Sequence, residues 1–323
     1  MKEKKKSRLR ADRVFLAMAA IVGTLFGADG LRRSLTGNQP NNIKIDGEFR
    51  SSEEIVETPT GNSLAYNTAD QATTAFEGIR NLGYAERELS RDMLSTGLLS
   101  VYTDDSPANE YDQDDMVSLS DEKNEFYSLS DDDIYLNDDA ADALNRMMED
   151  YANETALSDF IVYGTTNTYT GGDSFCPLDF TESKAGYCVD LALNAYGSVM
   201  AYDGYDTEGW VVDNCWKYGF IVRCPEGKAE KTGVEYCPWH LRYVGEINSA
   251  IMEQKNMCLE EYVDFLEQYS FDDPYTFAFN GNGYQIYSVA GEEDKLVARV
   301  PLSGNYEFSG DNRGAFIITV HKN

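Results

Sequence analysis

Basic residues are scarce in this 323-residue chain. Lysine and arginine number 27 against 56 aspartates and glutamates, which gives a formal net charge of −29. A field of that sign repels phosphate backbones, so nucleic acid is excluded as a partner. Aromatic residues are not scarce: 22 tyrosines and 15 phenylalanines are too many for an extended disordered protein. We therefore expect most of the chain to fold.

Long apolar runs are also missing, with one exception near the start. The uncharged residues 14–28 follow a segment, residues 1–13, that carries seven lysines and arginines. About 15 apolar residues suit a signal peptide, whereas a free-standing membrane span needs roughly 20. Residues 1–30 are therefore predicted to be a signal peptide or a membrane anchor, and both alternatives place the body of the protein outside the cytoplasm. Residues 31–100 are predicted to be a linker and a weakly structured region.

Cysteine is absent from the first 175 residues, and all six cysteines fall between Cys176 and Cys258. In an exported protein, an even number of clustered cysteines permits up to three disulfides without fixing their pairing. The same cysteines could be metal ligands or small buried apolar side chains. The clustering indicates a compact region within residues 140–270.

Regular alternation of strands and helices is missing as well. An apolar stripe predicts a helix from Asp138 or Asp139 to about Tyr151, and strands are expected at 159–163, 187–193 and 240–244. This mixed order favours an α+β domain, with an antiparallel sheet and flanking helices, over residues 101–272. After residue 273, short alternating runs separated by Gly- and Asn-rich turns predict a small all-β module over residues 273–323.

The region 209–245 resembles a known family. The segments that agree with it in kind, order and spacing are Tyr218–Ile221 (YGFI), Pro225–Lys228 (PEGK) and Trp239–Gly245 (WHxRYVG). They are similar to the second half of VanY-type zinc D-alanyl-D-alanine carboxypeptidases, and the likeness covers roughly residues 140–270. The resemblance implies the DD-peptidase/hedgehog-like fold, a cell-envelope location and an action on the peptide stems of peptidoglycan.

The resemblance also implies a set of site residues. In that family, zinc is held by the His and Asp of S-x-H-x-x-G-x-A-x-D and by the His of E-x-x-H, whose Glu is the general base. Asp190 and His240 match two ligand positions, but Ser183 stands at the first His and Cys237 stands at the Glu. Serine is a poor zinc ligand, and the only other histidine is His321 near the end of the chain. Ordinary metallopeptidase turnover is therefore not expected.

Two cysteines suggest how the site has changed. Cys188 lies two residues before Asp190, so both side chains point to one face of a strand, and Cys237 occupies the base position near His240. The alternatives are a remodelled zinc site of Cys188, Cys237, Asp190 and His240, a Cys188–Cys237 disulfide that plugs the pocket, and unpaired thiols. Cys237 as a nucleophile would have only His240 as its base.

The candidate substrate-binding residues are Ser183, Trp239, Arg242 and Tyr243. Trp239 either packs in the core or lines a pocket for a group such as an alanine methyl, and Arg242 either holds a carboxylate or pairs with an internal acidic residue. The sequence thus predicts an exported protein with a degenerate carboxypeptidase domain that binds peptide stems, or a cell-envelope protein, instead of cleaving them. An active enzyme with a remodelled zinc site and a disulfide-stapled structural domain are the alternatives, so the sequence leaves open whether the chain is an enzyme.

Overall fold

The computed structural model covers most of the chain from residue 82 onward. The residues it describes are 79, 82–103, 105–108, 115–164, 181–195, 197–302 and 306–321. The predicted signal peptide or anchor at 1–30 and the cysteine Cys176 lie outside them. Within the described ranges, no helix is both long and apolar enough to cross a membrane.

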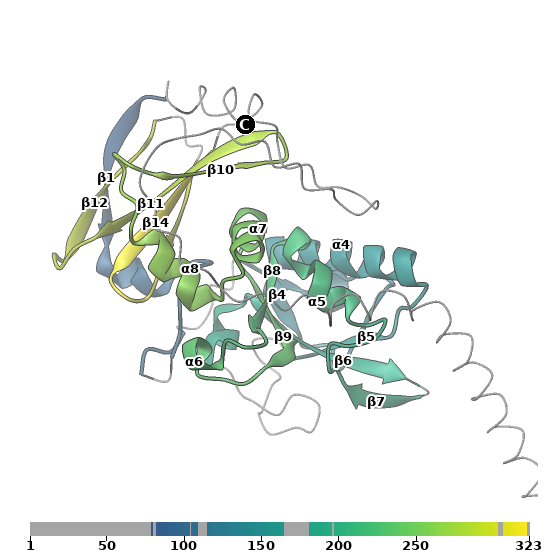
Figure 1. The fold of residues 1–323 in the computed structure, drawn as a ribbon. Helices are drawn as coiled ribbons and strands as arrows, with labels where there is room; N and C mark the ends of the chain where they lie inside the picture. Colours follow the sequence, from purple (N-terminus) through teal and green to yellow (C-terminus); the bar gives the residue numbers. More distant parts are fainter. Residues whose placement is uncertain are drawn as a thin grey trace, which may run out of the picture. The chain divides into compact units, whose positions relative to one another are not determined.

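A six-stranded sheet forms the centre of the main domain (Figure 1). Its neighbouring strands run antiparallel except for one parallel pair, β3 with β5. The predicted antiparallel sheet is thus confirmed, with a short parallel edge that the sequence did not reveal. In spatial order the strands are β3 (Ser128–Leu129), β5 (Phe160–Gly164), β6 (Cys188–Ala195), β9 (Cys237–Tyr243) and β8 (Phe220–Cys224), with β7 (Ser198–Ala201) on β6.

Helix α4 (Asp138–Thr155) covers one face of this sheet. It begins at the predicted place, but its cap is Asn137, whose side chain accepts a hydrogen bond from the Ala140 amide at 3.3 Å. Its apolar stripe is fully buried, and the Tyr151 ring meets the Phe160 ring of β5 edge-on at 5.0 Å. This face of the sheet holds the main hydrophobic core.

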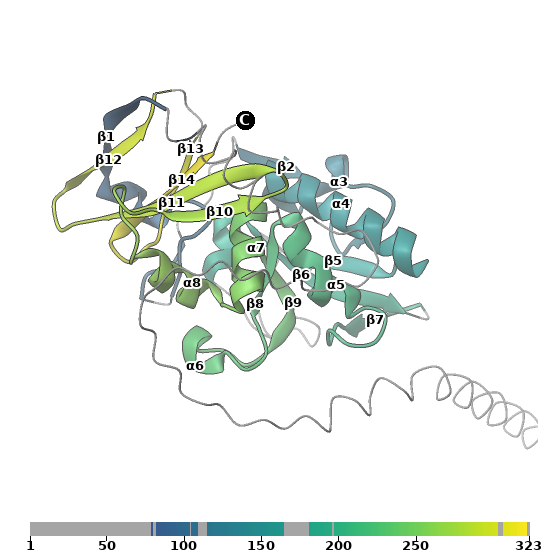
Figure 2. The ribbon, with the colours of Figure 1, turned by 45° about the horizontal axis from the view of Figure 1, so that its top comes forward.

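A second core lies beside β8, where helices α7 (Glu246–Lys255) and α8 (Leu259–Leu266) pack together with apolar residues of the C-terminal strands. Those strands form a four-stranded antiparallel sheet, which confirms the predicted all-β module (Figure 2). In spatial order they are β10 (Tyr275–Phe279), β11 (Asn282–Ala290), β14 (Ala315–His321) and β13 (Tyr306–Gly310).

Residues 82–99, the described end of the predicted linker, contain a strand and a helical turn. Strand β1 (Tyr84–Ser90) pairs antiparallel with β12 (Lys295–Pro301) over its whole length. Part of the expected linker is therefore an edge of the C-terminal module. The remaining short elements are η1 (Arg91–Ser95), β2 (Met116–Ser118), α3 (Leu119–Glu122), β4 (Tyr135–Asn137), η3 (Thr181–Ala185), α5 (Trp210–Asn214), η4 (Cys215–Tyr218) and α6 (Ala229–Thr232).

The segment 96–103 ties the two sheets together. The Leu99 amide donates to the Ser309 hydroxyl at 2.9 Å, and the Val101 amide donates to the Asp311 carbonyl at 3.1 Å. Leu99 and Val101 are both buried in the second core, which holds residues from α7, α8 and the C-terminal strands. The β module therefore packs on the main domain instead of standing free.

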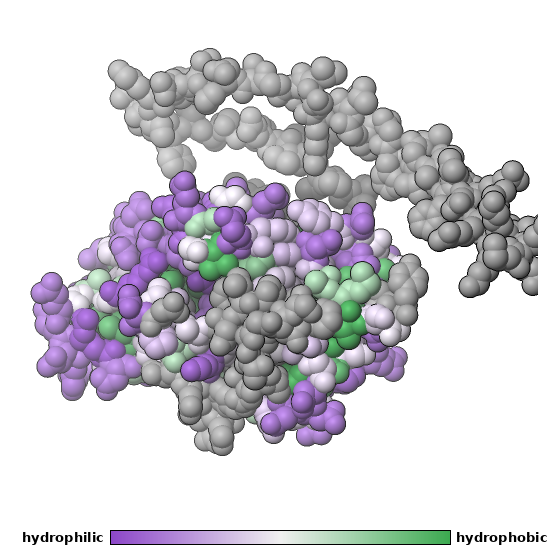
Figure 3. All heavy atoms as spheres, turned by 90° about the horizontal axis from the view of Figure 1, so that it is seen from below, coloured by the Kyte–Doolittle hydropathy of each residue, from purple (hydrophilic) through white to green (hydrophobic). Residues whose placement is uncertain are grey.

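Much of the visible surface is polar, as the strong negative charge requires (Figure 3). Apolar side chains show as separate patches on this face. In the part of the chain that the structure describes, the exposed large hydrophobic residues are Val199, Met200, Tyr205, Val297 and Leu302. Scattered exposed residues of this kind are normal and mark no interface by themselves.

Candidate functional site

Strand alternation brings the predicted ligand residues to one face of the main sheet. Asp190 of β6 is the register partner of His240 of β9, and Cys188 is the partner of Arg242. Because side chains alternate along a strand, these four point to the same side, away from the main core. The prediction that Cys188 and Asp190 share a face is confirmed.

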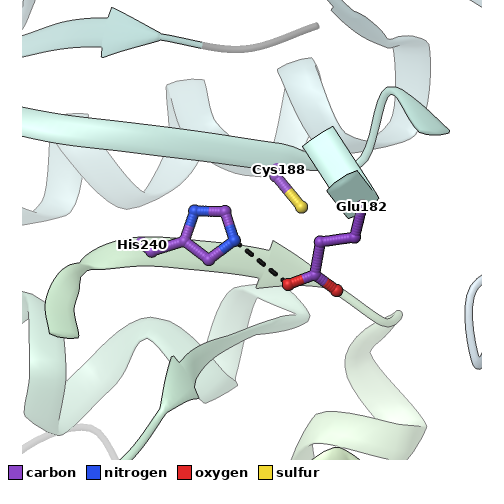
Figure 4. Close-up of side chains that lie close together, drawn as sticks. All are labelled: Glu182, Cys188 and His240. Atoms are coloured by element: carbon purple, nitrogen blue, oxygen red, sulfur yellow. Dashed lines mark hydrogen bonds and ion pairs between the residues drawn. The ribbon is translucent and has the colours of Figure 1, made fainter. Parts of the chain in front are cut away.

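His240 lies at the centre of this face and is fully buried. Its Nδ1 is 2.6 Å from Asp190 Oδ1, and its Nε2 is 3.1 Å from an oxygen of Glu182 (Figure 4). Burial alone would lower the pKa of His240, but the charge of Asp190 and the interaction with Cys188 raise that pKa well above its usual range. Each ring nitrogen therefore lies within hydrogen-bonding distance of a carboxylate oxygen, an arrangement that favours the protonated ring.

Glu182 of η3 is the residue that sequence analysis missed. It is only 3% exposed, and its carboxylate accepts from Arg223 Nε at 2.9 Å and from Arg242 Nη1 at 3.3 Å, in addition to His240. Burial would raise its pKa, but the charge of Arg223, the His240 hydrogen bond and the charge of Arg242 together hold that pKa far below its usual value. A carboxylate directly before Ser183, in the metal-binding motif, was the available signal.

Arg223 extends the cluster to helix α8. Its Nη2 lies 2.6 Å from Glu260 Oε1 and its Nη1 lies 3.2 Å from Oε2, which is a bidentate pair. Glu260 is 7% exposed and Arg223 is 5% exposed. Arg223, His240 and Arg242 thus lie among three carboxylates, Glu182, Asp190 and Glu260, in one buried network.

The guanidinium of Arg242 makes hydrogen bonds to other groups of the protein. Besides Glu182, its guanidinium donates to the carbonyls of Tyr243 and Leu98, each at 3.3 Å. It also lies over the rings of Tyr102 and Tyr187, with 5.3 Å to each centroid. Of the two roles predicted for Arg242, pairing with an internal acidic residue is the one observed.

Replacing Arg242 with lysine should lower the free energy of unfolding by about 2 kcal/mol, because a lysine keeps the charge but loses the planar stacking and the fork of donors. Urea denaturation of both proteins measures the difference. Arg146→Lys is the matched control, since Arg146 is exposed and its pair with Glu246 should contribute less than about 1 kcal/mol. Equal losses in the two variants would contradict the stacking role.

Three of these side chains could hold a metal ion. One ligand atom each from Glu182, Cys188 and His240 lies within 4.8 Å of the others, and all three residues are buried (Figure 4). Carboxylate, thiolate and imidazole are donors that zinc accepts, and Asp190 on the second nitrogen of His240 is a common outer partner of a metal-bound histidine. The donor types fit zinc, but binding would require His240 to lose its Nε2 proton and Glu182 to exchange its cationic partners for the metal.

The other predicted site residues lie elsewhere. Cys237 is three positions from His240, an odd number, so it points to the opposite face, into the main core. It therefore joins neither Cys188 nor the Glu182–Cys188–His240 group, and the Cys188–Cys237 disulfide is not formed: both are free thiols. Trp239 packs in the same core, where the Tyr243 ring meets Phe220 at 5.3 Å. Ser183 is buried in η3 and is not one of the three possible metal ligands.

Comparison with known proteins agrees with this geometry. The solved D,D-dipeptidase VanXYg, in complex with a D-Ala-D-Ala phosphinate analog, has the same fold: its TM-score is 0.62 at 23% identity, over 74% of this chain and 100% of that one. The chain therefore shares the fold of that protein. Residues 180–246 match the sequence profile of the VanY D-alanyl-D-alanine carboxypeptidases.

A D-alanyl-D-alanine carboxypeptidase of Enterococcus faecium is 32% identical over 247 residues, which are 73% of this chain and 78% of the relative. The bifunctional dipeptidase and carboxypeptidase VanXYC of Enterococcus gallinarum is 53% identical over 51 residues, 16% of this chain and 27% of that protein. The chain belongs to the VanY D-alanyl-D-alanine carboxypeptidase family. An alignment of 247 residues is longer than the region 140–270, so the likeness extends beyond the part that the motifs indicated.

Proposed function

We propose that this chain is a non-hydrolysing member of its family that binds peptidoglycan peptide stems ending in D-Ala-D-Ala. The observation that carries the loss of hydrolysis is the buried ion-pair network at the family's metal position, where both nitrogens of His240 face carboxylates and Glu182 is shared with Arg223 and Arg242. The binding of peptide stems rests on family membership. In addition, the relative VanXYg was solved with a D-Ala-D-Ala phosphinate analog.

The general base is the second missing part. A base for peptide hydrolysis works best with a pKa near the working pH. The pKa of Glu182 is held far below that range by Arg223 and its other partners, so its carboxylate is a weak base. Cys237, at the position of the family's Glu, points into the hydrophobic core. Neither residue can activate a water molecule for attack on a peptide carbonyl.

We further propose that the protein acts outside the cytoplasm, attached to the membrane or secreted. The support is the cationic segment 1–13 followed by the uncharged run 14–28. Peptide stems, or a protein of the cell envelope that carries or processes them, are then within reach. The strong negative charge of the chain would repel anionic polymers. Short peptides are therefore the class of ligand that we propose.

A second candidate function, an active zinc carboxypeptidase with a remodelled site, is favoured by one observation. This is the convergence of Glu182, Cys188 and His240 within 4.8 Å. Zinc bound there would supply an acidified water and polarise the peptide carbonyl. The chain's own residues would hold it through one carboxylate, one thiolate and one imidazole.

One experiment separates the two candidates. The full chain is dialysed against zinc and then assayed for bound metal, for release of D-alanine from a peptide ending in D-Ala-D-Ala, and for binding of that peptide by calorimetry. The expected result is no stoichiometric zinc, no release, and binding that a peptide ending in L-Ala-L-Ala does not reproduce. One zinc per chain with D-alanine release, both lost in Cys188→Ala, would instead establish the remodelled enzyme. Absence of binding and of release would leave the structural alternative.

A further inference from the structure

Two cysteines on the core side of the main sheet face each other across neighbouring strands. Cys224 ends β8 and Cys237 begins β9, and the two are register partners in an antiparallel pair, just after an irregularity between Val222 and Cys224. Each is only 1% exposed, and both belong to the main hydrophobic core. Both side chains therefore lie on the same face of the sheet, opposite each other across the strand pair.

This arrangement meets the geometric requirement for a cross-link. Directly opposed residues of antiparallel strands have Cα atoms about 4.5 to 5.5 Å apart. A disulfide needs Cα atoms about 4.4 to 6.8 Å apart, so joining these two requires no movement of the backbone. Both side chains are buried in the same core, so they lie on one side of the strand pair.

The other described cysteines have different surroundings. Cys188 points to the opposite face of the sheet, beside His240. The Cys215 thiol donates to the Val212 carbonyl, and the Cys258 sulfur accepts from a backbone amide at the start of α8. Among the described residues, Cys224 and Cys237 are thus the cysteines that face each other across a strand pair.

We propose that Cys224 and Cys237 are a disulfide site, oxidised by exchange with a small disulfide such as oxidised glutathione. The bond would place a covalent link between β8 and β9 at the position where the family carries its general base. This proposal is independent of whether the chain hydrolyses or only binds peptides, since it concerns the other face of the sheet.

The reaction balances in two steps. One of the two thiols, Cys224 or Cys237, loses its proton to solvent, and its thiolate attacks one sulfur of glutathione disulfide and releases one glutathione thiolate, which takes a proton. The other protein thiol then loses its proton to solvent, its sulfur attacks the protein sulfur of the mixed disulfide, and the second glutathione leaves as a thiolate that takes a proton. Two protein thiols and one glutathione disulfide give one protein disulfide and two glutathione thiols, so two electrons pass from the protein to glutathione.

The test uses the full chain. Both sulfurs are buried in the folded protein, so they react either before the sheet closes or when it opens. The protein is unfolded, then refolded either with glutathione disulfide and glutathione or with dithiothreitol. Both samples are blocked with iodoacetamide and digested with trypsin without reduction. Cleavage after Arg223, Lys228 and Lys231 puts the two cysteines on separate peptides, 224–228 and 232–242. Mass spectrometry should find these peptides linked in the oxidised sample alone.

A melting curve gives a second readout. Closing the short loop between Cys224 and Cys237 should raise the melting temperature of the oxidised protein above that of the reduced protein by roughly 5 to 10 °C. Cys224→Ala should lose this redox-dependent shift, whereas Cys215→Ala, at another buried cysteine, should keep both the shift and the linked peptides. Alkylated peptides 224–228 and 232–242 in the oxidised wild type, or a link from either to Cys176, would overturn the proposal whatever the variants do.

Discussion

Replacing Glu182 with glutamine should lower the free energy of unfolding by about 3–5 kcal/mol. Glutamine has nearly the shape of glutamate but no charge, so the variant leaves three buried cations facing two carboxylates. The Glu182 carboxylate lies 2.9 to 3.3 Å from Arg223, Arg242 and His240, so all three side chains lose their shared carboxylate in the variant. Urea denaturation at pH 7 in the presence of a chelator measures this difference on metal-free protein.

The matched control for this variant is Glu246→Gln. Glu246 also pairs with an arginine, Arg146, at 2.9 Å, but both side chains are more than a third exposed. An exposed pair of this kind contributes less than about 1 kcal/mol because water already solvates both charges. If Glu182→Gln were no more harmful than the control, the buried network would not depend on its central carboxylate.

Replacing His240 with glutamine should destabilise the protein by about 3 kcal/mol in mildly acidic solution, where the loss of the imidazolium leaves Asp190 and Glu182 short of one cation. The effect should depend on pH. Because the folded protein raises the pKa of His240, its contribution is fully present below the unfolded value of about 6.5 and is lost as the pH rises through the folded pKa. The gap between wild type and variant should therefore be largest near pH 5.5 and shrink steadily above pH 6.5.

Unfolding free energies of both proteins between pH 5.5 and 9, in chelator, provide the measurement. His321→Gln is the control, since this second histidine lies at the end of β14 and pairs with the Glu307 carboxylate at 4.0 Å. Its substitution should change stability by less than about 0.5 kcal/mol at any of these pH values. A constant gap for His240→Gln across the range would mean that the buried ring is neutral.

Several features of the fold were predictable because they depend on local patterns. The two-residue period of a strand placed Cys188 and Asp190 on one face, and their cross-strand partners confirm it. The turns after residue 273 are rich in glycine and asparagine, and these residues marked where the C-terminal strands begin and end. Helix α4 was visible from its apolar stripe.

The errors concern contacts between distant segments. Strand β1 pairs with β12, more than 200 positions later, and its exposed charged residues gave no alternating apolar signal. Cys237 was assigned to the site because it stands at the position of the family's Glu, three residues before His240, although three positions along a strand lead to the opposite face. Glu182 lies in a short helical turn, so only the folded chain could bring it to the two arginines.

Arg242 of β9 lies over the Tyr102 ring and donates a hydrogen bond to the Leu98 carbonyl. These two contacts limit where this domain can be cut from the chain. A fragment cut to residues 115–272 would retain β9 but lack the segment that covers its guanidinium. That segment, in turn, is held by Ser309 and Asp311 of the C-terminal module. Strand β9, which carries His240, therefore depends on segments outside its own domain. Any chimera or truncation intended to preserve β9 must include both residues 96–103 and the last strands of the chain.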